Sequence, residues 1–141
     1  MGIWHVRANL EEMNERGKNT MSEHLGIEIV EMGDNYLTAK MPVDSRTKQP
    51  MGIMHGGASC VLAETVGSIA SNGCVDPEKY YCVGLDINTS HIRMAKSGFV
   101  YGTATPVNLG KKIHVWEIKI LDSESRLISL TRLTLAVLDR R

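Results

Sequence analysis

The chain has 141 residues, and its 16 lysine and arginine residues equal its 16 aspartate and glutamate residues. This balance gives no overall attraction to nucleic acid or to an anionic membrane, and no apolar run approaches the roughly 20 residues of a membrane-spanning helix. The three cysteines lack a C-x-x-C spacing, which favours reduced thiols in the cytoplasm. The histidines form no H-E-x-x-H pair, so no metal site is expected. We expect one soluble domain over residues 1–141.

Two short helices followed by two strands are predicted in the first third of the chain. Residues 9–17 and 20–26 each begin with a capping pair, Asn or Thr followed three residues later by Glu, and each segment ends at a glycine. Strands are predicted over residues 26–31 and 36–41, with a Gly-Asp-Asn turn between them. An irregular loop with two prolines then leads to residue 52.

The most apolar stretch of the chain, residues 55–70, predicts a helix that is buried on all sides and ends near Gly73. Glu64 is the only charged residue between His55 and Asp76. Burying an unpaired carboxylate is costly or raises its pKa. We therefore expect Glu64 to serve either a structural ion pair or chemistry.

The start of this helix offers a second chemical group. Gly56 and Gly57 follow His55, so no side chain blocks a ligand from the unpaired backbone N–H groups of the first turn. Such a helix start suits a developing oxyanion. Together with Glu64 about two turns further on, it has the composition of an acyl-transfer site.

The rest of the chain is predicted as strands, over residues 81–93, 99–105, 113–121 and 126–138. In the first of these, Val83, Leu85 and Ile87 are expected on one apolar face. The links between the strands are short, which favours antiparallel neighbours. The element order predicts an α+β fold in which a curved antiparallel sheet wraps around one long buried central helix.

Residues 49–57 (Q-P-M-G-I-M-H-G-G), followed by Glu64 and Ser68, resemble the acyl-CoA thioesterases of the hotdog fold, in the branch with a glutamate on the central helix. Members of this branch act on dihydroxynaphthoyl-CoA in menaquinone synthesis, or proofread an aryl carrier protein in siderophore synthesis. The similarity runs almost end to end and includes residues 19–21, 24–26, 41–44, 83–88, 108–110 and 129–137. It implies a homotetramer made of two dimers. It also implies thioester hydrolysis without metal or cofactor, coenzyme A being part of the substrate or product.

Carried onto this sequence, the resemblance assigns catalysis to five residues. Glu64 is expected to act as nucleophile or as general base on water, and Gly56 to donate its backbone N–H to the thioester oxygen. His55 and Gln49 match residues that polarise or position the thioester and the water, and Ser68 matches a hydroxyl that orients the attacking water. In the family the site lies between two subunits, and these groups do not all come from one chain.

Each assignment has a structural alternative. Glu64 fits an ion pair in a dimer interface, and His55 fits a backbone hydrogen bond at the helix start. Gly56 and Gly57 fit close packing of the helix on the sheet. The Ser68 hydroxyl fits a bond to the carbonyl one turn earlier.

Substrate binding is assigned to a second set of residues. Coenzyme A requires cations and backbone donors for its phosphates. Met54 is expected to line the acyl pocket, with core filling as the alternative. Met94 departs from the proline or serine usual in close relatives. The candidates are Met54 and Gly57 beside the motif, and His91, Arg93, Lys96, Gly110, Lys111 and Lys112 for coenzyme A.

Two other functions are compatible with the predicted fold. A hydratase or dehydratase is disfavoured because the chain lacks an Asp-x-Asn-x-x-His loop. A non-catalytic acyl-CoA-binding module would not need Glu64. We therefore predict a thioesterase whose partner is an acyl-CoA or aryl carrier-protein thioester, with no nucleic acid and no membrane partner.

Overall fold

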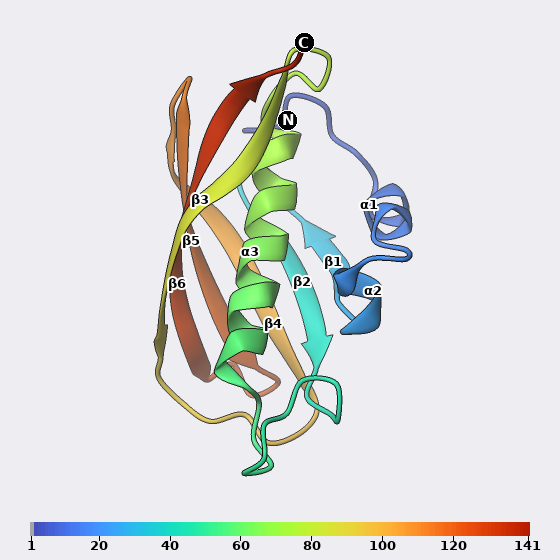
Figure 1. Cartoon of the computed structure of the whole chain (residues 1–141), viewed down its shortest axis with the longest axis vertical. Coiled ribbons are helices and arrows are strands. Elements are labelled where there is room, and N and C mark those ends of the chain that lie inside the picture. The colour runs from blue at the N-terminus through green and yellow to red at the C-terminus, as the bar shows by residue number, and fades with distance from the viewer. Residues whose placement is uncertain (1) are drawn as a thin grey trace.

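The structure is a computed structural model and describes residues 2–141. Its elements are α1 (Leu10–Arg16), α2 (Met21–His24), β1 (Glu28–Met32), β2 (Leu37–Pro42), α3 (Gly56–Gly73), β3 (Tyr80–His91), β4 (Phe99–Leu109), β5 (Ile113–Asp122) and β6 (Leu127–Asp139). The six strands form one antiparallel sheet in the order β1-β2-β4-β5-β6-β3, which curves around α3 (Figure 1). The predicted α+β architecture is confirmed. None of the helices among residues 2–141 is long and apolar enough to cross a membrane.

The two short helices begin where the capping pairs predict. The Asn9 side chain accepts a hydrogen bond from the backbone N–H of Glu12 (2.8 Å), and the Thr20 hydroxyl accepts one from that of Ser22 (3.2 Å). Gly26 follows α2 with a φ of +74°, a left-handed conformation that favours glycine. Both helices lie beside β1, on one flank of α3 (Figure 1).

Helix α3 is packed on one face only. The sheet covers small and apolar residues that recur three to four positions apart, namely Ala58, Ser59, Leu62, Ala63, Val66, Gly67, Ala70 and Ser71. On the opposite face Gly57, Glu64 and Asn72 are exposed. The prediction of a helix buried on all sides is therefore wrong for the single chain, because residues 2–141 leave these three positions exposed.

The end of α3 also differs from the prediction. Gly73 is the last helical residue, with Cys74 as the C-cap, and it is not among the glycines with positive φ. A Cβ at position 73 would lie 3.1 Å from a ring carbon of Trp4. Glycine at this position therefore serves close packing against Trp4 rather than a left-handed turn.

A bulge changes which residues of β3 face the helix. The pairing of β3 with β6 shifts register between Gly84 and Asp86, so Leu85 is an extra residue in β3. Val83 and Leu85 are 38% and 59% exposed, whereas Ile87 packs against the core. The prediction that Val83, Leu85 and Ile87 share one apolar face is wrong, because a bulge breaks the two-residue period.

The strand order corrects two further expectations. β3 pairs with β6 and not with β4, so the short link between β3 and β4 does not join neighbours. It crosses beneath the start of α3 instead (Figure 1). β4 continues to Leu109, because a bulge between Pro106 and Asn108 accommodates a proline that cannot donate to the ladder. The link to β5 is therefore residues 110–112 only.

Candidate active site

A cavity of about 680 Å³ lies along the uncovered side of α3, between that helix, α1, β1 and the N-terminal segment. From α3 it is lined by Glu64, Thr65 and Ser68, and on the other side by residues that include Trp4 and Val6. Figure 1 shows α1 and β1 on the same side of α3. The volume falls within the range of about 300–1,000 Å³ that is typical of small-molecule sites.

Glu64 extends from the middle of α3 toward β3. A Cβ at Gly84 of β3 would lie 2.3 Å from Oε2 of Glu64, so the glycine leaves the space that this carboxylate occupies. Glu64 is exposed, and residues 2–141 provide no ion-pair partner for it. The expected burial of this carboxylate is therefore not found in the single chain.

The start of α3 has one capped and one open N–H group. Nδ1 of His55 accepts a hydrogen bond from the backbone N–H of Gly57 (2.8 Å), the backbone bond named above as the structural alternative for His55. Its contact with the thioester stays a prediction. The ring can fold over this turn because a Cβ at position 57 would lie 2.9 Å from Nδ1. Among residues 2–141, no backbone or side-chain acceptor is recorded for the N–H of Gly56. That group is available to a ligand.

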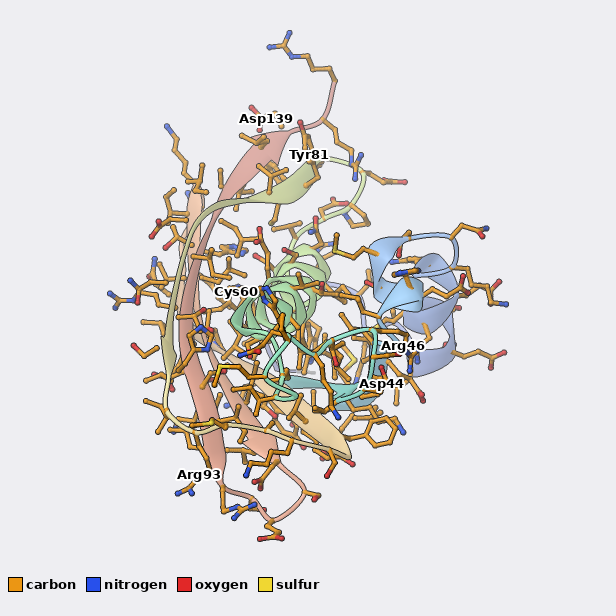
Figure 2. The ribbon with its side chains drawn as sticks, turned by 60° about the horizontal axis from the view of Figure 1, so that its bottom comes forward. Asp44, Arg46, Cys60, Tyr81, Arg93 and Asp139 are labelled. Atoms are coloured by element: carbon orange, nitrogen blue, oxygen red, sulfur yellow. The ribbon has the colours of Figure 1, made fainter. Side chains whose placement is uncertain are left out.

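His91 contacts the same turn from the end of β3. A Cβ at Gly56 would lie 3.0 Å from Nε2 of His91, so glycine at position 56 makes room for this ring. Arg93 is exposed beyond it, at the edge of the molecule in Figure 2, and Lys96 is exposed in the crossover. Three of the predicted coenzyme A contacts thus belong to the end of the molecule where α3 begins.

The other predicted coenzyme A contacts lie far from this end. Lys112 stands just before β5, and the first residue of β5 pairs with Ala136, whereas His91 pairs with Ser129. Seven residues along β6 correspond to roughly 24 Å. A single chain therefore does not bring Gly110, Lys111 and Lys112 together with His91.

The loop before α3 holds Gln49 next to the helix start. The side-chain oxygen of Gln49 accepts a hydrogen bond from the backbone N–H of Met51. The backbone N–H of Gln49 donates to the carbonyl of Ile53 (2.9 Å). The loop is tied to the crossover, since Met54 donates its N–H to the carbonyl of Ala95 (2.8 Å). Met54 is 8% exposed in the core and does not line the cavity, so its role in the acyl pocket stays a prediction.

Ser68 lies one turn from Glu64 on the cavity wall. Its carbonyl accepts a hydrogen bond from Nδ2 of Asn72 (2.9 Å), but no partner is recorded for its hydroxyl among residues 2–141. The alternative in which this hydroxyl bonds the preceding turn is therefore not observed. The hydroxyl is free to contact a substrate or a water molecule.

The predicted catalytic groups do not meet within one chain. Gly56 and Glu64 are eight residues apart on α3, which corresponds to about 12 Å along the helix axis. A thioester carbonyl needs the oxyanion donor within about 3 Å and the carboxylate nearby. The chain thus presents two half-sites, one with Glu64 and Ser68 and one with His55, Gly56 and the nearby His91.

A third histidine, His114, lies in a buried cluster near the other end of α3. His114 is 3% exposed, and its Nδ1 is 2.5 Å from the hydroxyl oxygen of Ser71. Burial lowers the pKa of His114, opposed by a hydrogen bond with the backbone of Gly110. Nearby, burial raises the pKa of the Cys74 thiol to about 12, and all three cysteines are free, as predicted. We therefore interpret this buried cluster as a contribution to the stability of the fold rather than to the active site.

Residues 2–141 contain no group of three or more His, Cys, Asp or Glu side chains placed to bind a metal ion. Sequence reasoning missed three features of the site: Gly84, Thr65 and the N-terminal lining of the cavity. Gly84 could have been found from the sequence, because a glycine inside an apolar strand indicates that another group approaches the backbone closely. No sequence feature pointed to the N-terminal lining.

Comparisons with known proteins identify the family. Residues 51–129 match the profile of the Thioesterase superfamily. The 1,4-dihydroxy-2-naphthoyl-CoA hydrolase of Escherichia coli (strain K12) is 47% identical over 136 residues, covering 96% of this chain and 99% of that one. The proofreading thioesterase EntH of Cronobacter turicensis is 44% identical over 137 residues, covering 96% of this chain and 98% of that one.

Solved structures give the same result. A crystal structure of a thioesterase variant (Q49A) from Pseudomonas aeruginosa matches with a TM-score of 0.97 and 45% identity, covering 99% of this chain and 100% of that one. A thioesterase from Haemophilus influenzae matches with a TM-score of 0.95 and 46% identity, covering 97% and 95%. The chain therefore belongs to the thioesterase superfamily. It has the hotdog fold and is a thioesterase, an enzyme that hydrolyses thioesters.

Proposed function

We propose that this thioesterase hydrolyses aromatic acyl-CoA or aryl carrier-protein thioesters, with Glu64 as the catalytic carboxylate. The observation that carries the proposal is the position of Glu64, exposed and without an ion-pair partner in residues 2–141, at the border of a large cavity. The similarity to a 1,4-dihydroxy-2-naphthoyl-CoA hydrolase supports an aromatic acyl group of the dihydroxynaphthoyl or hydroxybenzoyl type. A role in menaquinone synthesis follows if dihydroxynaphthoyl-CoA is the preferred substrate.

The proposed chemistry needs no cofactor. Glu64 either attacks the carbonyl carbon itself or removes a proton from the water that attacks it. The N–H of Gly56 stabilises the oxyanion, and the Ser68 hydroxyl orients the water. His55 and Gln49 position the thioester. In the general-base route, the proton taken from water passes to the sulfur as the C–S bond breaks, so the free acid and the thiol of coenzyme A or the carrier are released. In the nucleophilic route, breaking the C–S bond leaves the acyl group on Glu64 as an anhydride. Water then hydrolyses this anhydride, which restores the carboxylate and supplies the proton of the thiol.

Relatives support the choice of Gln49 and Glu64. A Staphylococcus aureus protein of the same fold, 38% identical, has been crystallised with a glutamate replaced by alanine and, separately, with a glutamine replaced by alanine. The separation of these two positions in that chain equals the separation of Gln49 and Glu64 here.

We further propose that two chains combine to complete each site. β3 is a twelve-residue edge strand with exposed Val83 and Leu85, and such an edge readily pairs with a second chain. A twofold axis beside it would place the uncovered faces of two α3 helices antiparallel. Glu64 of one subunit would then act with His55 and Gly56 of the partner subunit. The proposed assembly is a homotetramer of two such dimers.

The first test compares wild-type enzyme with Glu64→Ala on benzoyl-, hydroxybenzoyl-, naphthoyl-, short-chain and long-chain acyl-CoA and on an aryl-loaded carrier protein. Release of free thiol is measured. We expect aryl thioesters to turn over best and Glu64→Ala to lower kcat by about 10²–10⁴-fold. Glu78→Ala, at an exposed glutamate outside the cavity, is the matched control.

Retained activity in a folded Glu64→Ala protein would exclude Glu64 as the catalytic carboxylate. Failure of the wild-type enzyme to hydrolyse any aryl thioester would exclude the aromatic substrate. The hydratase alternative finds no support among the relatives compared above.

The second test mixes two inactive variants, Glu64→Ala and His55→Ala, by co-expression. If each site uses Glu64 from one subunit and His55 from the other, half of the dimers are mixed and each has one intact site. We then expect about a quarter of the wild-type activity per subunit. If each chain carried a complete site, the mixture would be as inactive as its components.

A further inference from the structure

The two sides of the cavity differ in origin and chemistry. The α3 side carries Glu64, Thr65 and Ser68, which belong to the region matched by the superfamily profile. The opposite side lies outside that region. We call the part of it formed by Trp4, Val6, Ala8 and Met13 the amino-terminal wall.

The amino-terminal wall is fixed at both of its sides. The indole N–H of Trp4 donates to the carbonyl of Gly33 in the β1–β2 turn (2.7 Å), and the Trp4 ring packs on Gly73 at the end of α3. The backbone N–H of Ile3 donates to Asp34 (3.0 Å), and that of His5 donates to Gly73 (2.9 Å). The wall is therefore a rigid boundary rather than a loose terminus.

Two side-chain amides that line the cavity are already bonded within the chain. The side-chain amide of Asn14 donates to the carbonyl of Ile29 (3.0 Å) and accepts from its N–H (2.7 Å). Asn72 bonds the backbone of Ser68 and Cys82 in the same way. The apolar side chains of the lining, such as Trp4, Met13, Ile27 and Ile29, are therefore the surface that these amides leave to a ligand, and Ser68 lies one turn from Glu64.

We propose that the amino-terminal wall determines the size of the acyl group, so that this enzyme prefers bulky apolar acyl groups, such as naphthoyl, over short ones. The proposal rests on the proposed function, in which the thioester reacts beside Glu64. Val6 is the residue through which size is set, because its side chain lines the cavity yet is 60% exposed, so a larger side chain is tolerated by the fold.

The test is Val6→Trp, which fills part of the cavity. We expect kcat/KM for naphthoyl-CoA to fall about tenfold or more, while kcat/KM for butyryl-CoA changes less than about threefold. The matched control is Val107→Trp, because Val107 is 56% exposed and does not line the cavity. Equal effects of Val6→Trp on both thioesters, or no effect on naphthoyl-CoA, would overturn the proposal.

A binding measurement separates this proposal from the catalytic one. A naphthyl ketone analogue of the thioester, in which CH₂ replaces sulfur, binds without being hydrolysed. We expect it to change the fluorescence of Trp4 in the wild-type protein but not in Trp4→Phe, where only the fully buried Trp116 remains. Calorimetry should show at least about tenfold weaker binding to Val6→Trp.

If Val6→Trp binds the analogue as tightly as the wild-type protein, the amino-terminal wall does not determine acyl-group size, even if Glu64 proves catalytic. If Val6→Trp binds it more weakly, the role of the wall is supported, even if Glu64→Ala stays active. The two proposals therefore fail by different results.

Discussion

The packed face and the open face of α3 both carry polar side chains, but these differ in whether they have a partner within the chain. On the packed face, Gly67 lies against Leu133, and Ser71 is bonded to the buried His114. On the open face, the Glu64 carboxylate and the Ser68 hydroxyl have no recorded partner among residues 2–141. Of Ser68 on the open face and Ser71 on the packed face, only Ser71 has a side-chain hydrogen-bond partner among residues 2–141.

This contrast separates stability from chemistry within one helix. Buried polar groups that are bonded stabilise the fold, and leaving one unbonded costs about 1–3 kcal/mol. Exposed polar groups without partners contribute little to the fold and can act on a ligand. Substitutions on the packed face should therefore change stability, and those on the open face should change activity.

The largest expected effect is on the open face. Gly84→Ala places a Cβ 2.3 Å from the present position of Oε2 of Glu64, so the carboxylate must move. We expect kcat to fall about 100-fold, because a shift of about 1 Å in a reacting group has that effect. Thermal unfolding should be nearly unchanged. Adding Gly84→Ala to Glu64→Ala should cause no further loss, and an additive loss would contradict this explanation.

The next effect belongs to the packed face. A Cβ at Gly67 would lie 2.5 Å from Cδ2 of Leu133. Gly67→Val should lower the free energy of unfolding by about 1–3 kcal/mol in chemical denaturation, because the core is already filled. The kcat per folded molecule should not change. Combining it with Leu133→Ala should cost less than the sum of the two, and strict additivity would argue against this contact.

The two serines give a matched pair with a smaller effect. Ser68→Ala should lower kcat about tenfold and leave stability unchanged, because its hydroxyl has no recorded partner in residues 2–141. Ser71→Ala should lower the free energy of unfolding by about 1 kcal/mol and leave kcat unchanged, because it removes a partner of His114. Steady-state kinetics and chemical denaturation of both variants test these expectations. A loss of stability in Ser68→Ala together with a loss of kcat in Ser71→Ala would contradict the distinction between the two faces.

The smallest effect is the pH dependence of the packed face. Burial lowers the pKa of His114 below its ordinary value of 6.5, so the folded protein favours the neutral ring. This contribution to stability is complete above pH 6.5 and is lost as the pH falls from there toward the folded-state pKa, because the unfolded chain binds the proton more tightly. The melting temperature should fall more steeply below pH 6.5 in the wild-type protein than in His114→Gln. Equal slopes would contradict this role.

Local signals predicted the local structure well. The capping pairs gave both short helices, and the apolar run gave α3, because these patterns depend on neighbours in the sequence. The bulge at Leu85 and the pairing of β3 with β6 were not readable, since both depend on residues far along the chain. The link after β3 is short, but it crosses to another part of the sheet.

The sequence predicted the residue types of the candidate site, but not the exposure of Glu64 or the residues that line the cavity. The single carboxylate and the two glycines of the helix start stood out by type. The exposure of Glu64 could not be predicted, because an apolar helix does not reveal whether its own chain covers every face. The amino-terminal wall consists of ordinary apolar residues, so only the tertiary structure shows that they line the cavity.

The pairing of β3 with the last strand has a consequence for synthesis of the protein. β3 carries Gly84 and His91, but its neighbour in the sheet is β6, which runs to Asp139. A chain emerging from the ribosome therefore holds β3 without its partner strand until nearly all residues have been made, and such distant pairings form slowly. β6 pairs with β3 from Tyr80 to His91, so it holds the strand that carries both residues in place. The enzyme should thus gain activity only once its last strand has been released, and proteolytic removal of β6 should abolish it.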